Sequence, residues 1–313
     1  MDNKEKNFIS AVIYVHNARE HITAFMHMLI TVLEANFEHS EIICVNDCSE
    51  DESLQLIRES AKSAKVTNIS VLNMSYFHGL ELAMNAGVDL AIGDFVFEFD
   101  TIVFDYKPEE IMHVYRRALE GYDIVSASPD KWQKFTSNLF YFIFDKFTDL
   151  SHKMYSETFR ILSRRVINRV SSMNKTVPYR KAVYAHCGLK TGNMVYQQAG
   201  GIANRRNDIQ EKKYRRRLAV DVLILFTDMG YRFSMSMTFI MMLMAFAIAV
   251  YSVVIYIIGN PVEGWTTTIL FLSFSFFGLF GILTIIIKYL QILVDLVFRR
   301  KRYSFEGIEK LTR

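Results

Sequence analysis

The sequence is poor in cysteine and proline, with 3 and 4 residues of these types in a chain of 313. Cys44, Cys48 and Cys187 are too few and too unevenly spaced for a disulfide framework or a zinc site. A reducing compartment fits this cysteine content. The N-terminal stretch MDNKEKN lacks the apolar core of a secretory signal, so we expect residues 1–230 to stay on the side of synthesis.

Asp, Glu, Lys and Arg are missing from two long parts of the chain. The 30 residues between Arg232 and Glu263 contain none of them, nor do the 24 residues between Glu263 and Lys288. Each stretch exceeds the roughly 20 residues that a helix needs to cross a bilayer core. The sequence therefore predicts transmembrane helices at 233–258 and 265–294, and it argues against a wholly soluble, disordered or fibrous chain.

Basic residues flank these two apolar stretches. Residues 205–217 carry a net charge of +5 and residues 299–313 a net charge of +4, whereas the turn at 259–264 has no Lys or Arg. The positive-inside rule therefore predicts a multi-pass protein of the cytoplasmic membrane, with its main domain and both termini in the cytoplasm. Beside two spans, an anionic lipid surface suits the basic residues better than nucleic acid does.

The charge pattern also predicts how the chain is divided. Residues 1–205 form the main domain, and residues 206–232 read as a basic amphipathic helix next to the membrane, lying in the lipid interface. Its apolar face consists of Tyr214, Leu218, Val222, Leu225 and Met229. Residues 295–313 are expected to form a basic cytoplasmic tail.

Strand and helix patterns alternate in the main domain. Apolar, β-branched runs predict strands, and helical spacing predicts the helices between them. The strands are expected at 8–15, 41–45, 68–72 and 94–99, and the helices at 20–36, 52–64 and 79–91. This order predicts an α/β domain with a doubly wound, mainly parallel sheet. Ligands of such sheets bind where strands end, which is where His16-Asn17, Asn46-Asp47 and Asp100 lie.

Several motifs follow one another along the chain. They are Ile13–Asn17 with Glu20, Val45–Asp51, Gly79 to Gly93-Asp94 with Asp100, Gly121–Val125, Phe159–Arg165, and Lys288–Leu290 with Arg299–Tyr303. In this order and spacing they resemble the family-2, GT-A-type glycosyltransferases. The last pair is similar to the tail of the polyprenyl-phosphate branch, to which dolichol-phosphate mannose synthases belong. The resemblance implies a GT-A domain followed by two C-terminal transmembrane helices.

The resemblance also implies a reaction. It predicts transfer of a sugar, with inversion, from a nucleotide-sugar donor to a polyprenyl phosphate at the cytoplasmic membrane face, for envelope polysaccharide or glycan modification. It implies a homo-oligomer, since tetramers occur in the family. The nucleotide-binding residues it implies are Val15, His16, Asn17, Asp47, Asp51 and Gly79. An alternative role for Asp47 and Asp51 is to cap the helix that starts near Glu52.

The active-site motifs are partly degenerate. The family's paired metal-binding acids read Asp100-Thr101-Ile102 here, so the second carboxylate is missing, and the family's Asp before Phe-Arg is Thr158. Asp100 is therefore the predicted catalytic residue and the predicted ligand of Mg²⁺ or Mn²⁺. A single carboxylate should bind such a cation weakly, and mainly when the nucleotide supplies further oxygens.

A polyprenyl-phosphate acceptor would tolerate the loss of a general base. A phosphate monoester is largely dianionic at neutral pH, with a second pKa of about 6, so its oxygen can attack without deprotonation. The acceptor phosphate needs nearby cations, for which the candidates are Arg160, Arg164, Arg205, Arg206 and Lys213. Anchoring to anionic lipid is the alternative role of the basic cluster.

Two other functions stay open. A non-catalytic relative could serve as a binding or scaffold subunit of an envelope-polysaccharide complex, as Ile102 and Thr158 suggest, whereas Asp47, Asp100 and Arg160 count against it. A membrane transferase acting on a sugar hydroxyl of a lipid-linked glycan is the third. The sequence leaves the sugar and the nucleobase undetermined.

Overall fold

The computed structural model describes residues 4–130, 157–172, 179–198, 264–298 and 303–312, with a few single residues between 214 and 247. Internal contacts divide the chain into two compact units. The first combines 1–145, 149–219 and 301–313, and the second combines 146–148 and 220–300. The last residues of the chain therefore belong with the first ones.

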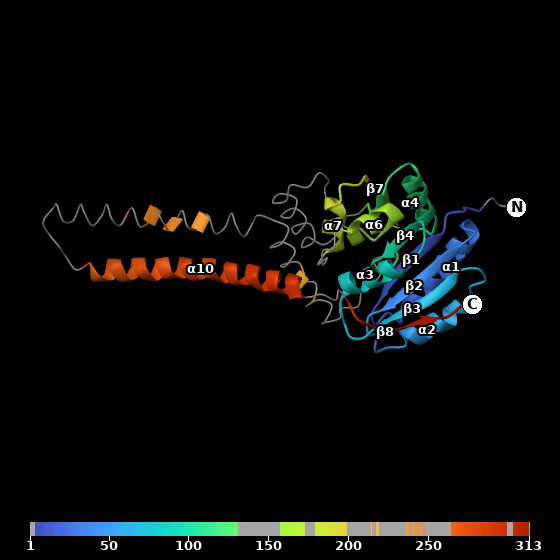
Figure 1. Cartoon of the computed structure of the whole chain (residues 1–313), viewed down its shortest axis with the longest axis horizontal. Coiled ribbons are helices and arrows are strands. Elements are labelled where there is room, and N and C mark those ends of the chain that lie inside the picture. The colour runs from blue at the N-terminus through green and yellow to red at the C-terminus, as the bar shows by residue number, and fades with distance from the viewer. Residues whose placement is uncertain are drawn as a thin grey trace. The chain divides into compact units, whose positions relative to one another are not determined.

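The described residues of the first unit build an eight-stranded sheet with the order β7-β5-β6-β4-β1-β2-β3-β8 (Figure 1). Its strands are β1 (Ile9–Val15), β2 (Ser40–Asn46), β3 (Asn68–Met74), β4 (Phe95–Phe99), β5 (Ile124–Pro129), β6 (Phe159–Ser163), β7 (Thr191–Tyr196) and β8 (Phe305–Lys310). Strands β1 to β4 pair with one another in parallel. Strand β6 pairs antiparallel with β4 and β5, and β8 pairs antiparallel with β3. The predicted mainly parallel α/β sheet is confirmed.

Helices connect most of the strands. They are α1 (Ile22–Asn36), α2 (Ser53–Ala61), α3 (Leu80–Leu90), α4 (Glu109–Leu119), α6 (Arg164–Ser172) and α7 (Arg180–His186), and the second unit contains α10 (Trp265–Phe298). The predicted strands and helices up to residue 100 agree with β1 to β4 and α1 to α3 to within a few residues at each end.

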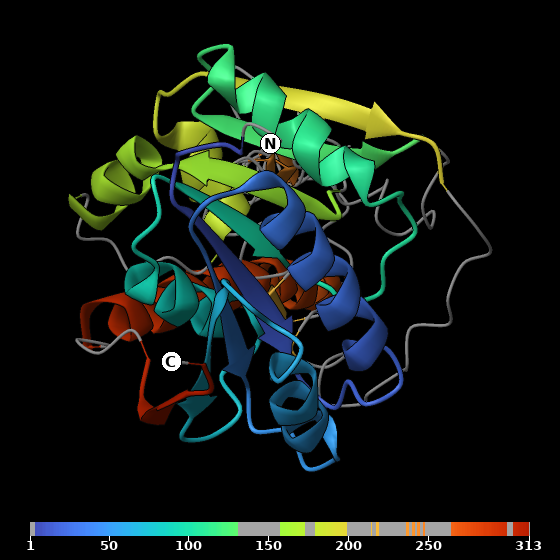
Figure 2. The same cartoon turned by 90° about the vertical axis from the view of Figure 1, so that its right-hand side faces the viewer.

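Both faces of the sheet are covered, which explains why β1 is buried along its whole length and mostly apolar (Figure 2). Side chains alternate along a strand, so Ile9, Ala11 and Ile13 pack in one cluster with α1 and α4. Val12 and Tyr14 pack in the other cluster, with α3 and α6. With both faces closed by helices, the loops at the strand ends are left to form a site.

Strand β8 corrects the prediction of a mere basic tail at 295–313. It pairs antiparallel with β3 at the edge of the sheet. Beyond it, Leu311 N donates to Ile69 O (2.8 Å) and Ile69 N donates to Thr312 Oγ1 (2.7 Å). The stretch FEGIEK shows no alternation of polar and apolar residues, and three of its six residues are charged, so its sequence does not predict a strand.

The predicted membrane helices are not supported by the structure. Within the part of the chain that it describes, no helix is both long enough and apolar enough to span a bilayer. The first predicted span, 233–258, and the predicted interfacial helix, 206–232, lie outside the described residues apart from single positions. The second predicted span, 265–294, falls within α10.

Candidate functional site

Three loops meet at one edge of the sheet, because β1, β2 and β4 are parallel and end there. The loop after β1 contains His16 and Asn17, the loop after β2 contains Asp47, and Asp100 follows β4. Asn17 has a positive φ of 48°. Such a conformation is uncommon outside glycine but tolerated by asparagine, and it turns the chain sharply at this edge.

Asp47 is fully buried and holds a neighbouring loop in place. Its Oδ1 accepts a hydrogen bond from His78 N (2.8 Å), and its Oδ2 accepts from Gly79 N (2.8 Å) and from the Tyr14 hydroxyl (3.1 Å). Its carboxylate charge is thus met by backbone and hydroxyl dipoles, which stabilise a carboxylate well. None of these contacts makes Asp47 a cap of α2. Its role in binding the donor nucleotide stays a prediction.

The loop after β1 is tied to the loop after β2. Val15 O accepts from Asp47 N (2.9 Å), and His16 Nδ1 lies 2.7 Å from Asp47 O. Asn17 Oδ1 accepts from Glu50 N (2.9 Å). The structure therefore brings together the residues that the resemblance implied for nucleotide binding at positions 15–17 and 47.

Asp51 caps the start of α2, as the alternative interpretation allowed. Its Oδ1 accepts from Ser53 N (3.0 Å) and its Oδ2 accepts from Arg19 N (3.1 Å). Burial alone would raise the pKa of Asp51, but these hydrogen bonds from Ser53 and Arg19 lower it overall. A carboxylate at a helix start is favourable, so this position is explained without a nucleotide.

Gly79 starts α3 with a φ of +82°, a conformation that side chains rarely adopt. A Cβ at this position would lie 2.4 Å from the ring of Tyr214. The Tyr214 ring also contacts Phe77 edge to face, with 6.1 Å between the ring centres. The close approach at Gly79 therefore accommodates Tyr214, a residue of the predicted juxtamembrane segment.

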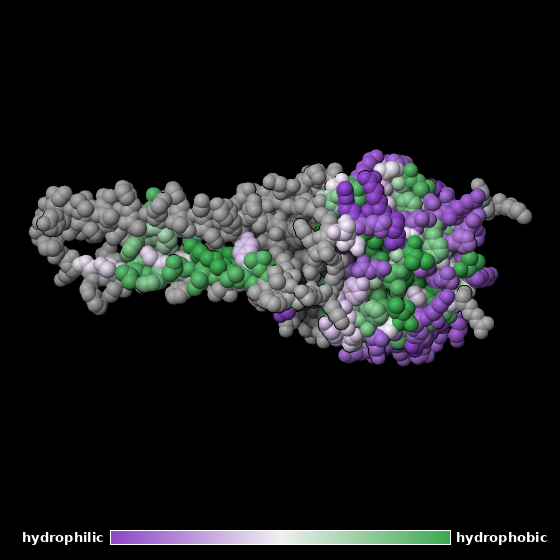
Figure 3. All heavy atoms as spheres, viewed as in Figure 1, coloured by the Kyte–Doolittle hydropathy of each residue, from purple (hydrophilic) through white to green (hydrophobic). Residues whose placement is uncertain are grey.

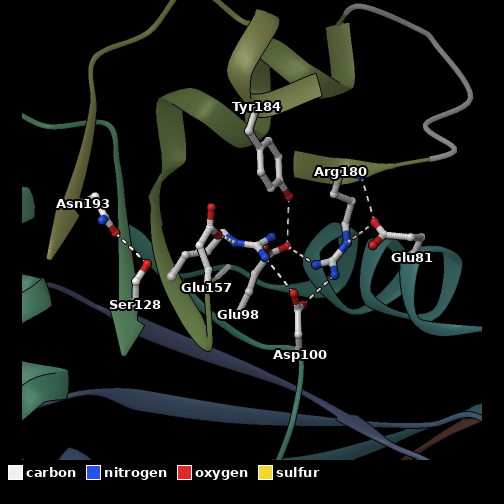
Figure 4. A network of polar contacts seen from close by, with 9 residues as sticks. Glu81, Glu98, Asp100, Ser128, Glu157, Arg180, Tyr184 and Asn193 are labelled. Carbon is white, nitrogen blue, oxygen red and sulfur yellow. Dashed lines mark hydrogen bonds and ion pairs between the residues drawn. The ribbon is translucent and has the colours of Figure 1, made fainter. Parts of the chain in front are cut away.

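Asp100 lies in a network of buried charges that also reaches the neighbouring strand and helix (Figure 4). Its Oδ2 accepts from Arg160 Nη2 (2.7 Å) and its Oδ1 accepts from Arg180 Nη2 (2.6 Å). The two guanidinium groups also clasp Glu98, through Arg160 Nη1 (2.7 Å) and Arg180 Nη1 (2.7 Å). Two arginines and two carboxylates thus form a closed ring.

Further carboxylates complete the network. Arg160 Nε donates to Glu157 (2.8 Å), and Arg180 Nε donates to Glu81 (3.0 Å). The register of the sheet explains one contact, because Glu98 on β4 is paired directly with Arg160 on β6. The other guanidinium comes from the first residue of α7. Four carboxylates and two guanidinium groups therefore form the network, and the charge of Lys181 acts on Asp100 as well.

The network determines the charge state of its members. Burial alone would raise the pKa of Asp100, but the charges of Arg160 and Arg180, with Lys181, hold it well below its ordinary value. The nearby carboxylates, Asp100 foremost, overcome the effect of burial and raise the pKa values of both arginines. Asp100 is therefore an anion and both arginines are cations at neutral pH.

Arg164 lies away from this network, contrary to the expected grouping with Arg160. Its guanidinium donates to Ala91 O (2.9 Å) and to Gly93 O, ahead of the start of β4. Because β6 runs antiparallel to β4, residues at the start of β6 lie near the end of β4 and residues after it lie near the start. Arg160 and Arg164 therefore lie toward opposite ends of β4.

The remaining predicted cations, Arg205, Arg206 and Lys213, lie outside the described residues. The sequence analysis singled out neither Arg180 nor Glu98. A signal for Glu98 existed, since a lone acid in the apolar strand FVFEF needs a cationic partner when buried. Nothing in the local sequence pointed to Arg180, because its partners are 80 to 99 residues away.

The divalent cation implied by the resemblance does not fit Asp100 as the structure has it. Each oxygen of Asp100 already accepts from a guanidinium group. Ile102, where the family has a second acid, is buried in the apolar core. Within the described ranges, no cluster of three or more His, Cys, Asp or Glu side chains could hold a metal ion. A cation at Asp100 would lie beside two guanidinium groups that already pair with this carboxylate and would be repelled by them.

Residues 10–172 match the family described as Glycosyl transferase family 2, which covers more than half of the chain. The chain belongs to glycosyl transferase family 2. The predicted assignment to a glycosyltransferase family is thereby confirmed. The match includes the loops after β1, β2 and β4 and the strand that carries Arg160, but it ends before Arg180.

Curated relatives of the chain are also named as glycosyltransferases or sugar transferases. The chain is 30% identical over 188 residues to an uncharacterised glycosyltransferase of Synechocystis, which covers 58% of each chain. It is 29% identical to an undecaprenyl-phosphate 4-deoxy-4-formamido-L-arabinose transferase of Aeromonas hydrophila, over 54% of this chain and 52% of that one. It is 26% identical to a prophage bactoprenol glucosyl transferase homolog of Escherichia coli, over 86% and 88%. The chain thus spans about half the length of most of these relatives.

Solved structures are similar only at a distance. A mannosyltransferase of Pyrobaculum calidifontis in complex with GDP-Man and Mn²⁺ has a TM-score of 0.47 and 13% identity, over 89% of this chain and 88% of that one. A glucosyl-3-phosphoglycerate synthase of Mycobacterium tuberculosis in complex with Mn²⁺ and UDP-glucose has a TM-score of 0.48 and 13% identity, over 70% and 79%. The nucleotide sugars and Mn²⁺ are ligands of these two solved structures.

Proposed function

We propose that this family-2 glycosyltransferase moves a sugar, with inversion, from a nucleotide-sugar donor to a polyprenyl phosphate. The observation that carries the proposal is the meeting of the Val15–Asn17, Asp47 and Asp100 loops at one sheet edge, within the matched family region. Two relatives of the chain are named for transfer to undecaprenyl phosphate and for bactoprenol. A lipid phosphate as acceptor is consistent with both names.

The chemistry of the acceptor suits the residues present. Thr158 stands where the family has an acid, and its hydroxyl lies 2.6 Å from the Tyr196 hydroxyl. A threonine cannot serve as the general base that a sugar hydroxyl needs. A phosphate oxygen, already an anion at neutral pH, can attack the sugar's anomeric carbon directly and expel the nucleoside diphosphate from the opposite face. The loss of the family's acid therefore favours a phosphate acceptor.

We further propose that the protein acts at the cytoplasmic face of a membrane. The two stretches without charged residues and the basic clusters beside them support this location. Along α10, large apolar side chains are exposed at a helical spacing, and Figure 3 shows apolar residues gathered on this helix. They are Leu272, Phe276, Leu279, Leu283, Ile286, Leu290 and Leu293. An apolar face of this kind needs lipid or another apolar partner.

The test is transfer by the purified full chain in lipid vesicles, with a panel of radiolabelled nucleotide sugars. Polyprenyl phosphate is the acceptor, and the matched control is the same polyprenol without its phosphate. We expect one donor to give a labelled lipid with the phosphate only, with an inverted anomeric centre by NMR. Label on a lipid-linked oligosaccharide instead would favour the hydroxyl-acceptor alternative.

Two variants separate an enzyme from a binding subunit. Asp100→Asn should abolish turnover, because it breaks the ion pairs that position Arg160 and Arg180, the cations nearest to the place where negative charge grows on the departing diphosphate. Arg58→Gln is the control, since Arg58 pairs with Glu309 on the surface, away from the site. Donor binding without product from any acceptor would favour the non-catalytic alternative and contradict the proposal.

A further inference from the structure

The C-terminal segment reaches the loop that Asp47 holds. Ser304 O accepts from Ser75 N (3.2 Å), and the hydroxyls of these two serines lie 2.9 Å apart. Ser304 N donates to His78 Nε2 (3.2 Å). Tyr303, the residue before, donates its hydroxyl hydrogen to Asp89 on α3 (2.9 Å). A segment 226 positions away in sequence from His78 therefore fastens the loop at 75–79.

His78 uses both nitrogens of its ring in this arrangement. Because Ser304 N is a donor, Nε2 must accept, so the ring hydrogen is on Nδ1 and is donated to Tyr76 O. The Tyr76 ring stacks on the imidazole, with 4.0 Å between ring centres, and the His78 side chain is only 2% exposed. The imidazole is therefore a neutral bridge between the loop and the C-terminal segment.

The same residue connects this bridge to Asp47. His78 N and the next amide, Gly79 N, each donate to an oxygen of Asp47. The Asp47 carbonyl in turn lies against His16 of the β1 loop. One continuous set of hydrogen bonds thus runs from the segment before β8 to the loops at the sheet edge.

We infer that His78 is a positioning residue of the nucleotide-binding loops and that Tyr303 and Ser304 hold its loop in place at the donor site. The inference rests on the proposed function, because that proposal assigns the nucleoside diphosphate of the donor to these loops. The loop at 75–79 lies between β3 and α3 and belongs to neither element. Its shape depends on contacts with Asp47 on one side and Ser304 on the other, and donor affinity depends on both.

Two isosteric variants of His78 separate its two contacts. In His78→Asn, the amide nitrogen can still donate to Tyr76 O, but nothing reaches the Nε2 position. In His78→Gln, the longer side chain brings an amide oxygen to the Nε2 position, where it can accept from Ser304 N. We expect His78→Asn to weaken nucleoside-diphosphate binding by about tenfold, the worth of one buried hydrogen bond, and His78→Gln to recover most of it.

A backbone variant tests the contact from the other side. Ser304→Pro removes the N–H that donates to His78 and also the hydroxyl that contacts Ser75, so it should weaken binding at least as much as His78→Asn does. The double variant should bind no more weakly than Ser304→Pro alone, because the proline already removes the hydrogen bond to His78. Glu309→Gln is the control: it disturbs β8 at its surface pair with Arg58 and should leave affinity unchanged. In turnover, the loss should appear in KM for the donor and leave kcat nearly unchanged.

A measurement without nucleotide keeps this inference separate from the proposed function. Hydrogen exchange of the peptide covering 75–79, followed by mass spectrometry, should be faster in His78→Asn and Ser304→Pro but not in His78→Gln or Glu309→Gln. Unchanged exchange in the first two variants would overturn the inference. Equal nucleotide affinity in all variants would overturn it as well. If exchange responds as expected and no nucleoside diphosphate binds the wild type, the proposed function fails, and with it the donor role of His78.

Discussion

Asp47 and Asp100 follow β2 and β4, the two strands that flank β1 in the sheet, yet their surroundings differ. Asp47 is met by two backbone N–H groups and a tyrosine hydroxyl, so its partners carry no charge. Asp100 is met by two buried guanidinium groups, each of which also pairs with other acids. Asp47 therefore fixes the shape of a loop, whereas Asp100 is part of the charged network at the ends of the strands.

The largest effect is expected at the center of the charged network. Arg160→Gln leaves Glu98, Asp100 and Glu157 facing one another with a single neighbouring guanidinium. Removal of one partner from a buried ion pair costs about 3–5 kcal/mol, so we expect a loss of free energy of unfolding of about 4 kcal/mol. Urea unfolding measures it. A loss below about 1 kcal/mol would show that the network is not closed to water.

A smaller effect on the free energy of unfolding is expected at Asp47, whose partners are two backbone N–H groups and a tyrosine hydroxyl. Asp47→Ala leaves two buried N–H groups without an acceptor, and each such group costs about 1–3 kcal/mol. We expect a loss of about 3 kcal/mol in the same assay. Asp47→Asn keeps one acceptor oxygen and should lose about half as much. Equal losses in the two variants would mean that the charge of Asp47 matters, and would remove the contrast with Asp100.

Acid pH should weaken the ion pairs of Asp100. The pKa of Asp100 is lower in the folded protein than its unfolded value of about 3.9. A lowered folded pKa contributes stability that is fully present above the unfolded pKa and is lost as pH falls toward the folded pKa. The stability gap between wild type and Asp100→Asn should therefore be constant from pH 7 to 5 and shrink below pH 4. Unfolding curves at pH 7, 5 and 3 test this, and a gap that stays constant at pH 3 would contradict it.

The smallest effect is expected at an exposed pair. Arg58 and Glu309 connect α2 with β8 at 2.8 Å, but their side chains are 48% and 37% exposed. Water and salt screen such pairs, so Arg58→Gln should cost no more than about 0.5 kcal/mol. A cost comparable with that of Arg160→Gln would show that exposure does not separate the two kinds of ion pair in this protein.

The sequence was most informative where contacts are local. The apolar periods up to residue 100 predict the strands and helices that place Asp47 and Asp100 at one edge, and the spacing of the motifs predicts the family. It was uninformative where partners are distant, because periodicity carries no signal for a contact such as Arg180 with Asp100 or Ser304 with His78. The antiparallel direction of β6 separates Arg160 from Arg164, which adjacency in sequence could not reveal.

A crystal structure with the nucleoside diphosphate of the preferred donor bound tests the central claim most directly. The account predicts the nucleotide at the edge formed by the loops after β1, β2 and β4, against the loop at 75–79, with its diphosphate toward Asp100 and its guanidinium partners. A nucleotide bound elsewhere on the domain, with these loops unoccupied, would contradict it.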